Sequence, residues 1–316
     1  APTSTGKGTL YCNGEKAVGI SNWTDTDATE AGVIPGIIIN RFFADAEEGE
    51  YKGFASAGFS GKKLIDPATR RYLKMPDDYK SGIYVSKVYG LGTGSEELEN
   101  SDVILKIDGK EINAYGRYDD PVYKKILYHH LISSYSDGEK MTFTIWRDGE
   151  EIAVPVTARK IHVDDMLVDY YEYDRQPEYI VTGGYIIQKL TRPYLQIWGD
   201  DWTGNAPPHL IHYYRDMAFN PTEKRKDVVI LSMVIPADIN LGYHSMGRQV
   251  IKKFNGMEIT CIEDILKAQK LNAPAKYDII EFEHSYPNVV IDRSKLPTAN
   301  RFISQTFRIR DLVNIN

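Results

Sequence analysis

The chain of 316 residues is long enough to form two or three domains, and no apolar run approaches the length that spans a bilayer. Its hydrophobic fraction of 42% and charged fraction of 26% are typical of globular proteins. The net charge is −6 and the basic residues are scattered, so we expect neither a membrane span nor a nucleic-acid partner. Cys12 and Cys261 are too few for a disulfide framework.

The N-terminal region, residues 1–43, is predicted to be β structure. A hairpin with its turn at Asn13 and Gly14 is followed by an apolar segment, 32–42, which we interpret as a buried strand that breaks at Pro35 and then begins a helix. The acidic stretch 44–50 is predicted to be a linker.

One sequence pattern occurs twice. Asp102–Ile112 reads Asp-Val-Ile-Leu-Lys-Ile-Asp-Gly-Lys-Glu-Ile, and Gln249–Ile259 reads Gln-Val-Ile-Lys-Lys-Phe-Asn-Gly-Met-Glu-Ile. Each copy predicts a hairpin, because an Asx-Gly pair provides the positive φ angles of a tight turn. The copies are a domain length apart, which indicates two related folding units in tandem.

The first unit is expected to occupy residues 51–159. In chain order we predict a Gly-rich loop (53–59), a short helix (67–75), a strand (82–89), the repeated hairpin, a helix (119–134) and two strands (140–147 and 151–158). Asp119 and Asp120 are interpreted as the N-cap of that longer helix.

The second unit follows a polar linker at 170–176 and repeats this order. We predict a Gly-rich start (181–185), a helical insert (208–219), a strand (228–235), the repeated hairpin, a helix (261–270), two strands (277–284 and 288–292) and a helical tail (298–309).

This order resembles the PDZ domains of bacterial and organellar proteases, and Ser101–Lys110 is similar to their Gly-Asp-x-Ile-x-x-Ile-Asn-Gly signature. Asp238–Tyr243 resembles a segment of the tandem PDZ arrangement of plant Deg proteases, and residues 10–20 and 32–39 resemble the last strands of a trypsin-like HtrA/Deg protease domain. The resemblance implies a mainly β (α+β) fold. Its parts would be a protease-domain remnant (1–46) and two PDZ-like domains, each a β-sandwich or partly open barrel (47–165 and 166–316).

The resemblance also implies a peptide site in the first unit. Amides of the Gly-rich loop would hold a peptide carboxylate, and the peptide would add as a strand to the sheet edge. The expected site residues are Ser56, Ala57, Gly58 and Phe59 in the loop, Ser60 at the start of the edge strand 60–63, and Leu127, Tyr128 and Leu131 on the facing helix. The alternative is that Gly58 is a plain turn residue and that the helix residues belong to the core.

The equivalent loop of the second unit is less clear in its expected role. Its residues are Thr182, Gly183, Gly184 and Tyr185. The insert that contains Trp198 and Trp202 could equally cover the groove. A blocked or oligomer-forming second domain is therefore as much expected as a binding one.

No catalytic residue is expected. In the resembled family the nucleophile lies in Gly-Asn-Ser-Gly-Gly-Pro just before the first of these strands, but here Gly6 takes the serine position and Ser4 lies two residues away. The family's base and orienting carboxylate lie upstream of that serine, whereas all seven histidines of this chain follow residue 128. His129 and His130 have no second ligand pair at metal spacing, so we expect no metal and no cofactor.

The predicted function is non-catalytic recognition of extended or C-terminal peptide segments, in the regulatory region of an HtrA/Deg-type protease that forms homo-oligomers. A chain that starts at Ala1 without methionine or signal peptide is interpreted as a processed or excised piece. One alternative is an active protease, in which a longer parent supplies the histidine and aspartate and the serine aligns at another position than Gly6. The other is a purely structural module with blocked grooves. The resemblance implies a bacterial periplasm or envelope and leaves a plastid or nuclear location open.

Overall fold

The computed structural model describes residues 8–24, 31–49, 51–76, 79–171, 176–222, 225–284 and 287–315. They form two compact units. Unit 1 consists of residues 1–87 and 92–160, and unit 2 consists of residues 88–91 and 161–316.

Unit 1 begins with a three-stranded antiparallel sheet, β1 (Leu10–Asn13), β2 (Lys16–Thr24) and β3 (Ala31–Pro35), followed by α1 (Gly36–Glu47). The hairpin and the break at Pro35 are as predicted. Two expectations are wrong. Val33 is 40% exposed and Ile34 is 37% exposed, because a sheet this small cannot bury both faces. Most of the predicted linker is the last turn of α1, since its Ala and Glu residues favour a helix.

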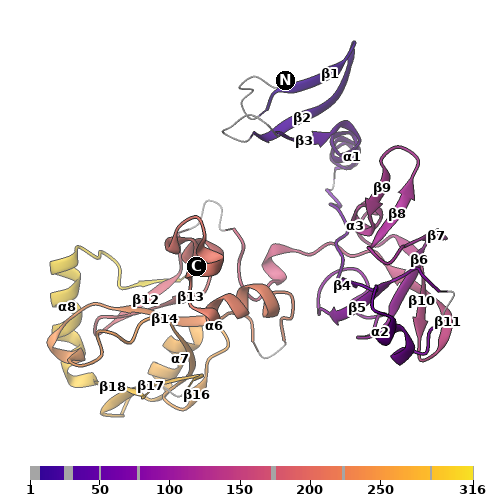
Figure 1. Ribbon diagram of the computed structural model, residues 1–316. Helices are drawn as coiled ribbons and strands as arrows, with labels where there is room; N and C mark the ends of the chain where they lie inside the picture. Colours follow the sequence, from indigo (N-terminus) through magenta and orange to yellow (C-terminus); the bar gives the residue numbers. More distant parts are fainter. Residues whose placement is uncertain are drawn as a thin grey trace. The chain divides into compact units, whose positions relative to one another are not determined.

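Unit 1 also contains a main sheet and short helices (Figure 1). Its strand order is β11 (Glu150–Thr157), β10 (Lys140–Arg147), β6 (Val103–Ile107), β5 (Ile83–Val88) and β4 (Phe59–Lys63), with β7 (Lys110–Glu111) paired to β6. One face packs on a core that includes Leu64, Val103 and Trp146, next to α2 (Pro67–Tyr72). On the other face Phe59 contacts Phe143 and the first residue of α3 (Tyr128–Ser133).

The helix predicted over 119–134 is wrong for its first half. The chain forms a hairpin of β8 (Arg117–Asp120) and β9 (Lys124–Leu127), and only then begins α3. Asp120 does not cap a helix. Its Oδ1 accepts hydrogen bonds from the amides of Val122 and Tyr123, both at 2.9 Å, and so closes the hairpin turn. Asp119 lies within β8.

Unit 2 is a longer sheet (Figure 1). Its strand order is β18 (Val289–Asp292), β17 (Tyr277–Phe282), β15 (Gln249–Phe254), β14 (Val229–Val234), β13 (Tyr185–Lys189), β12 (Tyr179–Thr182) and β19 (Val313–Asn314), with β16 (Met257–Glu258) paired to β15. Its helices are α4 (Arg192–Leu195), α5 (Trp202–Asn205), α6 (Pro208–His212), α7 (Glu263–Leu271), α8 (Leu296–Phe307) and five shorter turns: η1 (Val163–Asp165), η2 (Gln196–Trp198), the π-helix η3 (Tyr213–Met217), η4 (Asp238–Asn240) and η5 (Arg293–Lys295).

Both faces of this sheet are covered. Val229 and Leu231 point into a core shared with α7, whereas Ile230 and Val250 point into a second core shared with the insert of α4 to α6. The insert therefore covers a face of the sheet and not the edge of β13.

The two units share one topology. The order β11-β10-β6-β5-β4 in unit 1 matches β18-β17-β15-β14-β13 in unit 2, strand for strand. The repeated turns are held in the same way. The Asp108 amide donates to Thr142 O at 2.8 Å and the Thr142 amide donates to Asp108 Oδ1 at 2.7 Å. Asn255 and Ile279 exchange the same two bonds at 2.8 Å each. The sequence repeat thus produces a structural repeat, to which unit 2 adds β12 and β19.

The start of α7 makes unit 2 sensitive to acid. Asp264 Oδ2 accepts from the Thr260 amide at 3.0 Å, and Oδ1 pairs with Lys267 Nζ at 2.8 Å. Burial acts to raise the pKa of Asp264, but the hydrogen bonds from Lys267 and Thr260 outweigh it and lower the pKa. The charged form therefore stabilises the fold above the unfolded pKa of about 3.9, and this contribution is lost as pH falls below that value.

Asp264→Ala is accordingly expected to destabilise unit 2 by about 1–2 kcal/mol at pH 7. Urea unfolding at pH 7 and at pH 3 checks this, because the difference between the variant and the original chain should shrink at the lower pH. Curves that stay equally far apart at both pH values would contradict the assignment.

Candidate peptide-binding site

The candidate site of unit 1 lies along β4, which is the terminal strand of its sheet order. Alternate amides of this segment bond to the chain itself: Ser56 to Arg159 O at 2.9 Å, Gly58 to Thr93 O at 2.8 Å and Leu64 to Ala114 O at 3.1 Å. The Ser56 and Ser60 carbonyls accept bonds on that same inner side. Successive residues of a strand direct their N–H and C=O groups to opposite edges, so the intervening amides point to the outer edge. These are the amides of Ala57, Phe59, Gly61 and Lys63.

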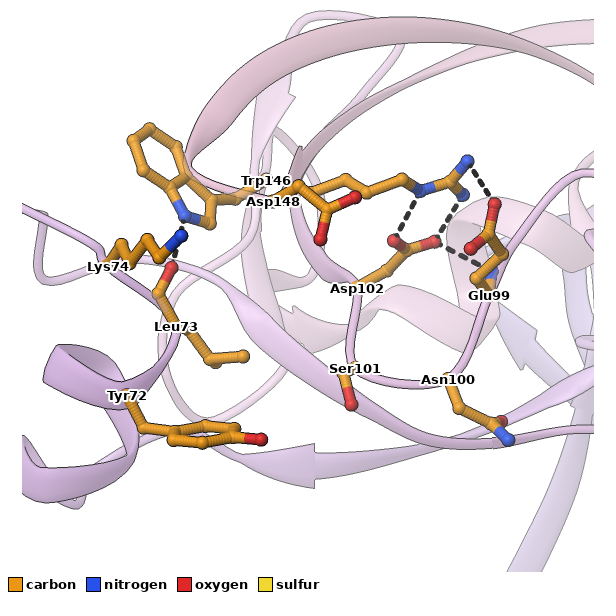
Figure 2. A pocket seen from close by; sticks show the side chains of 10 residues that line it. Tyr72, Leu73, Lys74, Glu99, Asn100, Ser101, Asp102, Trp146 and Asp148 are labelled. Carbon is orange, nitrogen blue, oxygen red and sulfur yellow. Dashed lines mark hydrogen bonds and ion pairs between the residues drawn. The ribbon is translucent and has the colours of Figure 1, made fainter.

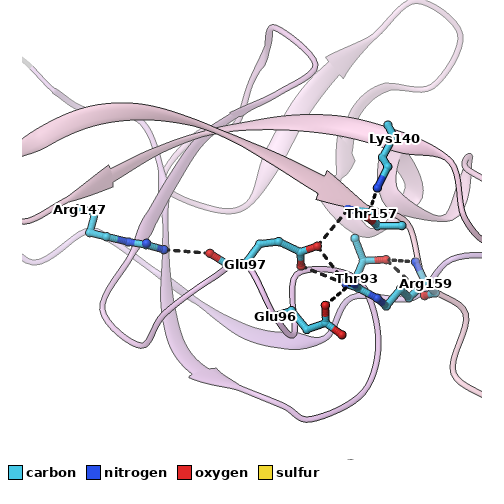
Figure 3. Close-up of polar contacts among 7 residues, drawn as sticks. All are labelled: Thr93, Glu96, Glu97, Lys140, Arg147, Thr157 and Arg159. Atoms are coloured by element: carbon cyan, nitrogen blue, oxygen red, sulfur yellow. Dashed lines mark hydrogen bonds and ion pairs between the residues drawn. The ribbon is translucent and has the colours of Figure 1, made fainter.

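The loop before β4 is held firmly from its inner side. The Thr93 amide donates to Ser56 O at 2.7 Å, and the Arg159 amide donates to Thr93 Oγ1 at 2.9 Å. Figure 3 shows the Arg159 guanidinium, which pairs with Glu97 Oε2 at 3.0 Å and so closes this clamp. The amide of Gly58, a residue of the predicted carboxylate-binding loop, donates to Thr93 O and is not available to a ligand. The outward amides of Ala57 and Phe59 are those that can meet a ligand.

The facing helix does not present the expected pocket. Tyr128 is 2% exposed, and its ring stacks on Phe59 with centroids 5.6 Å apart. An added Cβ on Gly61 would meet the Tyr128 hydroxyl at 2.8 Å, so this ring fills the space between α3 and β4. Leu131 is also buried in the core. Leu127 is 44% exposed, but it ends β9 and precedes the helix.

In unit 2 the corresponding loop is a tight hairpin turn whose polar groups are used by the chain. The Gly183 amide donates to Asn300 Oδ1 at 2.7 Å, and Gly183 O accepts from Asn240 Nδ2 at 2.7 Å. Gly184 O accepts from the Ile235 amide at 2.7 Å. Thr182 ends β12 and Tyr185 begins β13. Asn240 is fully buried, so Asp238–Tyr243 has a structural task at this turn.

The edge of β13 is also occupied. β12 pairs with it antiparallel from Tyr179 to Thr182, and β19 pairs with β12 in turn. An added strand would need the position that β12 holds. Unit 1 has no such strand among its described residues, so β4 and β13 differ in access although they correspond in topology.

A pocket of unit 1 away from β4 contains an ion pair that supports the fold (Figure 2). The Asp102 carboxylate is 1% exposed and accepts from Arg147 Nε and Nη2, both at 2.7 Å, and from the Glu99 amide at 2.8 Å. The hydrogen bond to Asp102 is the main cause that raises the pKa of Arg147. Asp102 belongs to the repeated pattern, and its partner fastens the end of β10 to the start of β6.

A further cavity of about 730 Å³ lies in unit 2 between α8 and the segment 236–244. Its lining is mostly apolar and includes Ile239, Leu241 and Phe302. It lies beside the hairpin turn, because a Cβ added to Gly183 would meet the lining residue Ile239 at 3.5 Å.

Ser4 and Gly6 lie outside the described residues. Within the described ranges, no imidazole nitrogen is hydrogen-bonded to a serine or a cysteine: the rings of His130, His209, His212 and His244 bond Tyr118, Arg248 O, Asp216 and Asn240. The described side chains also contain no group of three or more His, Cys, Asp or Glu residues placed to hold a metal ion. None of the described helices combines the length and hydropathy of a bilayer-spanning segment.

Two features near this site are not evident from the sequence. The hairpin of β8 and β9 occupies a segment with a helical pattern, although Pro121 preceded by two aspartates also fits a turn. The position of the Tyr128 ring over Gly61 had no sequence signal, because it depends on how α3 meets β4.

Comparisons with known proteins agree with the family resemblance. A protein-family profile described as "PDZ domain" matches residues 168–313. The chain is 29% identical over 280 residues to "Protease Do-like 2, chloroplastic" of Arabidopsis thaliana, covering 88% of this chain and 44% of that protein. It is 23% identical over 304 residues to "Protease Do-like 4, mitochondrial" of the same plant, covering 92% and 54%.

The chain thus spans about half the length of the curated relatives it matches. Among solved structures, "HtrA-type protease AlgW with decapeptide" superposes at a TM-score of 0.33 and 21% identity, over 46% of this chain and 43% of that one. A score this low supports no argument about geometry. The sequence matches carry the conclusion: the chain is a relative of the HtrA/Deg proteases and contains a PDZ domain at residues 168–313.

Proposed function

We propose that unit 1 binds peptides by β-strand addition along the outer edge of β4, as the recognition part of an HtrA/Deg-type protease. The observation that carries this proposal is the alternation of amides between Ser56 and Leu64. The amides on one side of this segment bond to the chain itself, and the amides on the other side point outward. An incoming strand would bond to Phe59, Gly61 and Lys63, with its C-terminal carboxylate at the amides of Ala57 and Phe59.

Residues 47–165 of unit 1 would be a first PDZ domain that precedes the PDZ-like domain at 166–316 in the chain, and residues 1–46 would be the end of a protease domain. The support for this division is the matching strand order of the two units and the matching turns at Asp108 and Asn255. The two units would differ in role. Unit 1 would recognise peptides, whereas unit 2, whose β13 is already paired by β12, would support assembly into homo-oligomers.

The described residues favour recognition over catalysis, because none of their imidazole nitrogens is hydrogen-bonded to a serine or a cysteine. We therefore propose that this region is non-catalytic and controls an attached protease. The names of the relatives also support a second candidate, an active protease in a longer protein of which this chain is part. The chloroplast and mitochondrion in those names favour an organelle, and the bacterial periplasm finds no specific support.

The strand-addition proposal is tested with N-methylated peptides. An added strand offers alternate amides to β4, so a methyl group on those amides removes the hydrogen bonds, whereas methylation of the intervening amides does not. We expect the first peptide set to bind at least about ten-fold more weakly than the unmodified peptide and the second set to bind within about two-fold of it. Fluorescence anisotropy of labelled peptides with the full chain measures both.

The two peptide sets control for each other, because they carry the same number of methyl groups. Equal weakening by both sets would show binding without a defined edge. Absence of saturable binding by any peptide would remove the proposed function.

A further inference from the structure

The far end of β4 is positively charged in a chain whose net charge is −6. Lys62 and Lys63 are both exposed, and neither pairs with a carboxylate of the described residues. Lys63 Nζ lies 5.5 Å from the ring centroid of Tyr115, which is itself exposed. The Leu64 amide bonds to Ala114 O at 3.1 Å and thereby holds this segment beside the end of β4.

The neighbouring hairpin adds a third cation. Arg117 is exposed and donates through Nη1 to Lys125 O at 2.9 Å, a bond that leaves its charge uncompensated. In the hairpin register Asp119 faces Lys125 and Asp120 faces Lys124, so these four charges offset one another. Lys62, Lys63 and Arg117 are therefore the cations of β4 and this hairpin that neither pair with a described carboxylate nor face one in the strand register.

The apolar end of the groove offers little discrimination, because the Tyr128 ring already fills the space between α3 and β4. A bound strand whose carboxylate lies at Ala57 and Phe59 must run antiparallel to β4. Each of its residues advances about 3.4 Å, so residues roughly three and four positions before its C-terminus lie opposite Lys62 and Lys63. Side chains at those positions meet the cations.

We infer that the outer edge of β4 selects peptides with acidic side chains about three and four residues before the C-terminus. This inference rests on the strand addition proposed above and names the class of peptide. Lysines on an edge strand can also serve only to prevent aggregation between sheet edges. That role predicts no preference among soluble peptides, so the two roles can be distinguished by experiment.

The test uses the full chain and three labelled ten-residue peptides that differ only at these two positions, which carry Glu-Glu, Gln-Gln or Lys-Lys. We expect the Glu-Glu peptide to bind about five-fold more tightly than the Gln-Gln peptide, as two exposed ion pairs would give, and the Lys-Lys peptide to bind most weakly. The difference should diminish as salt is raised from about 50 to about 500 mM.

The variant Lys62→Glu/Lys63→Glu should reverse the order, so that the Lys-Lys peptide binds most tightly. Lys252→Glu/Lys253→Glu is the matched control, because it changes two consecutive lysines of strand β15 in unit 2 and alters the net charge equally. It should keep the original order. Circular dichroism confirms that both variants are folded.

The outcomes separate the inference from the function beneath it. If the Gln-Gln peptide binds and shows the N-methylation signature, but all three peptides bind equally, strand addition stands and the acidic preference is wrong. The preference is equally overturned if the reversed variant still favours Glu-Glu. If no peptide binds saturably up to about 1 mM, the proposed function itself fails.

Discussion

Replacing Gly184 with alanine is expected to destabilise unit 2 by about 3–5 kcal/mol. Gly184 has a φ of +89°, which is unfavourable for a residue with a Cβ. That Cβ would also overlap the carbonyl oxygen of Ile235 and the side-chain nitrogen of Asn240. Both belong to the network that holds the turn, because Asn240 Nδ2 donates to Ile235 O at 2.8 Å and to Gly183 O at 2.7 Å.

Gly256→Ala is the matched control for this prediction. Gly256 also lies in a hairpin turn and has a φ of +80°, but an added Cβ would meet nothing within 4 Å. We expect a loss of only about 1 kcal/mol from the backbone conformation. Urea unfolding gives the two values, and amide exchange of β13 and β14 shows that the loss occurs in unit 2. Similar losses for the two variants would mean that the Asn240 network does not hold the turn.

Removing the positive partner of Asp102 is expected to have a comparable effect on unit 1. Arg147→Met leaves a carboxylate that is 1% exposed without its two charged hydrogen bonds. An uncompensated buried charge costs about 3–5 kcal/mol. We expect a value near 3, since the Arg147 side chain is partly exposed and water can reach part of the site. Urea unfolding of the full chain checks the value.

Two further variants show whether the buried charge is the cause. Asp102→Asn/Arg147→Met should be more stable than Arg147→Met alone, because the amide carries no charge and still accepts from the Glu99 amide. Lys52→Met removes an exposed pair with Glu48 and should change stability by less than about 0.5 kcal/mol. If the double variant is the least stable of the three, packing of the arginine stem and not the charge explains the loss.

Much of the fold was predictable, because the signals were local. The strands at 140–147 and 277–284, the two repeated hairpins and the C-terminal helix follow from alternation, Asx-Gly turns and helical periodicity. The helix over 119–134 was not, because a short hairpin and a short helix in sequence can imitate one longer helix. The sequence predicted a strand that begins at Ser60, close to the observed start of β4 at Phe59, whereas the direction of the alternate amides of this segment depends on Thr93 and Arg159, which are distant in sequence.

The amino-acid sequence by itself determined that one β unit occurs twice, since the Asx-Gly turn and its flanking apolar residues act within a few positions of each other. Tertiary structure alone decided which copy has its strand edge paired by the chain itself. That outcome depends on β12 folding back along β13 in unit 2 and on the bonds from Asn240 and Asn300 that hold its turn, whereas β4 stays the terminal strand of the unit 1 sheet. These contacts join residues far apart in the chain, so no local pattern encodes them.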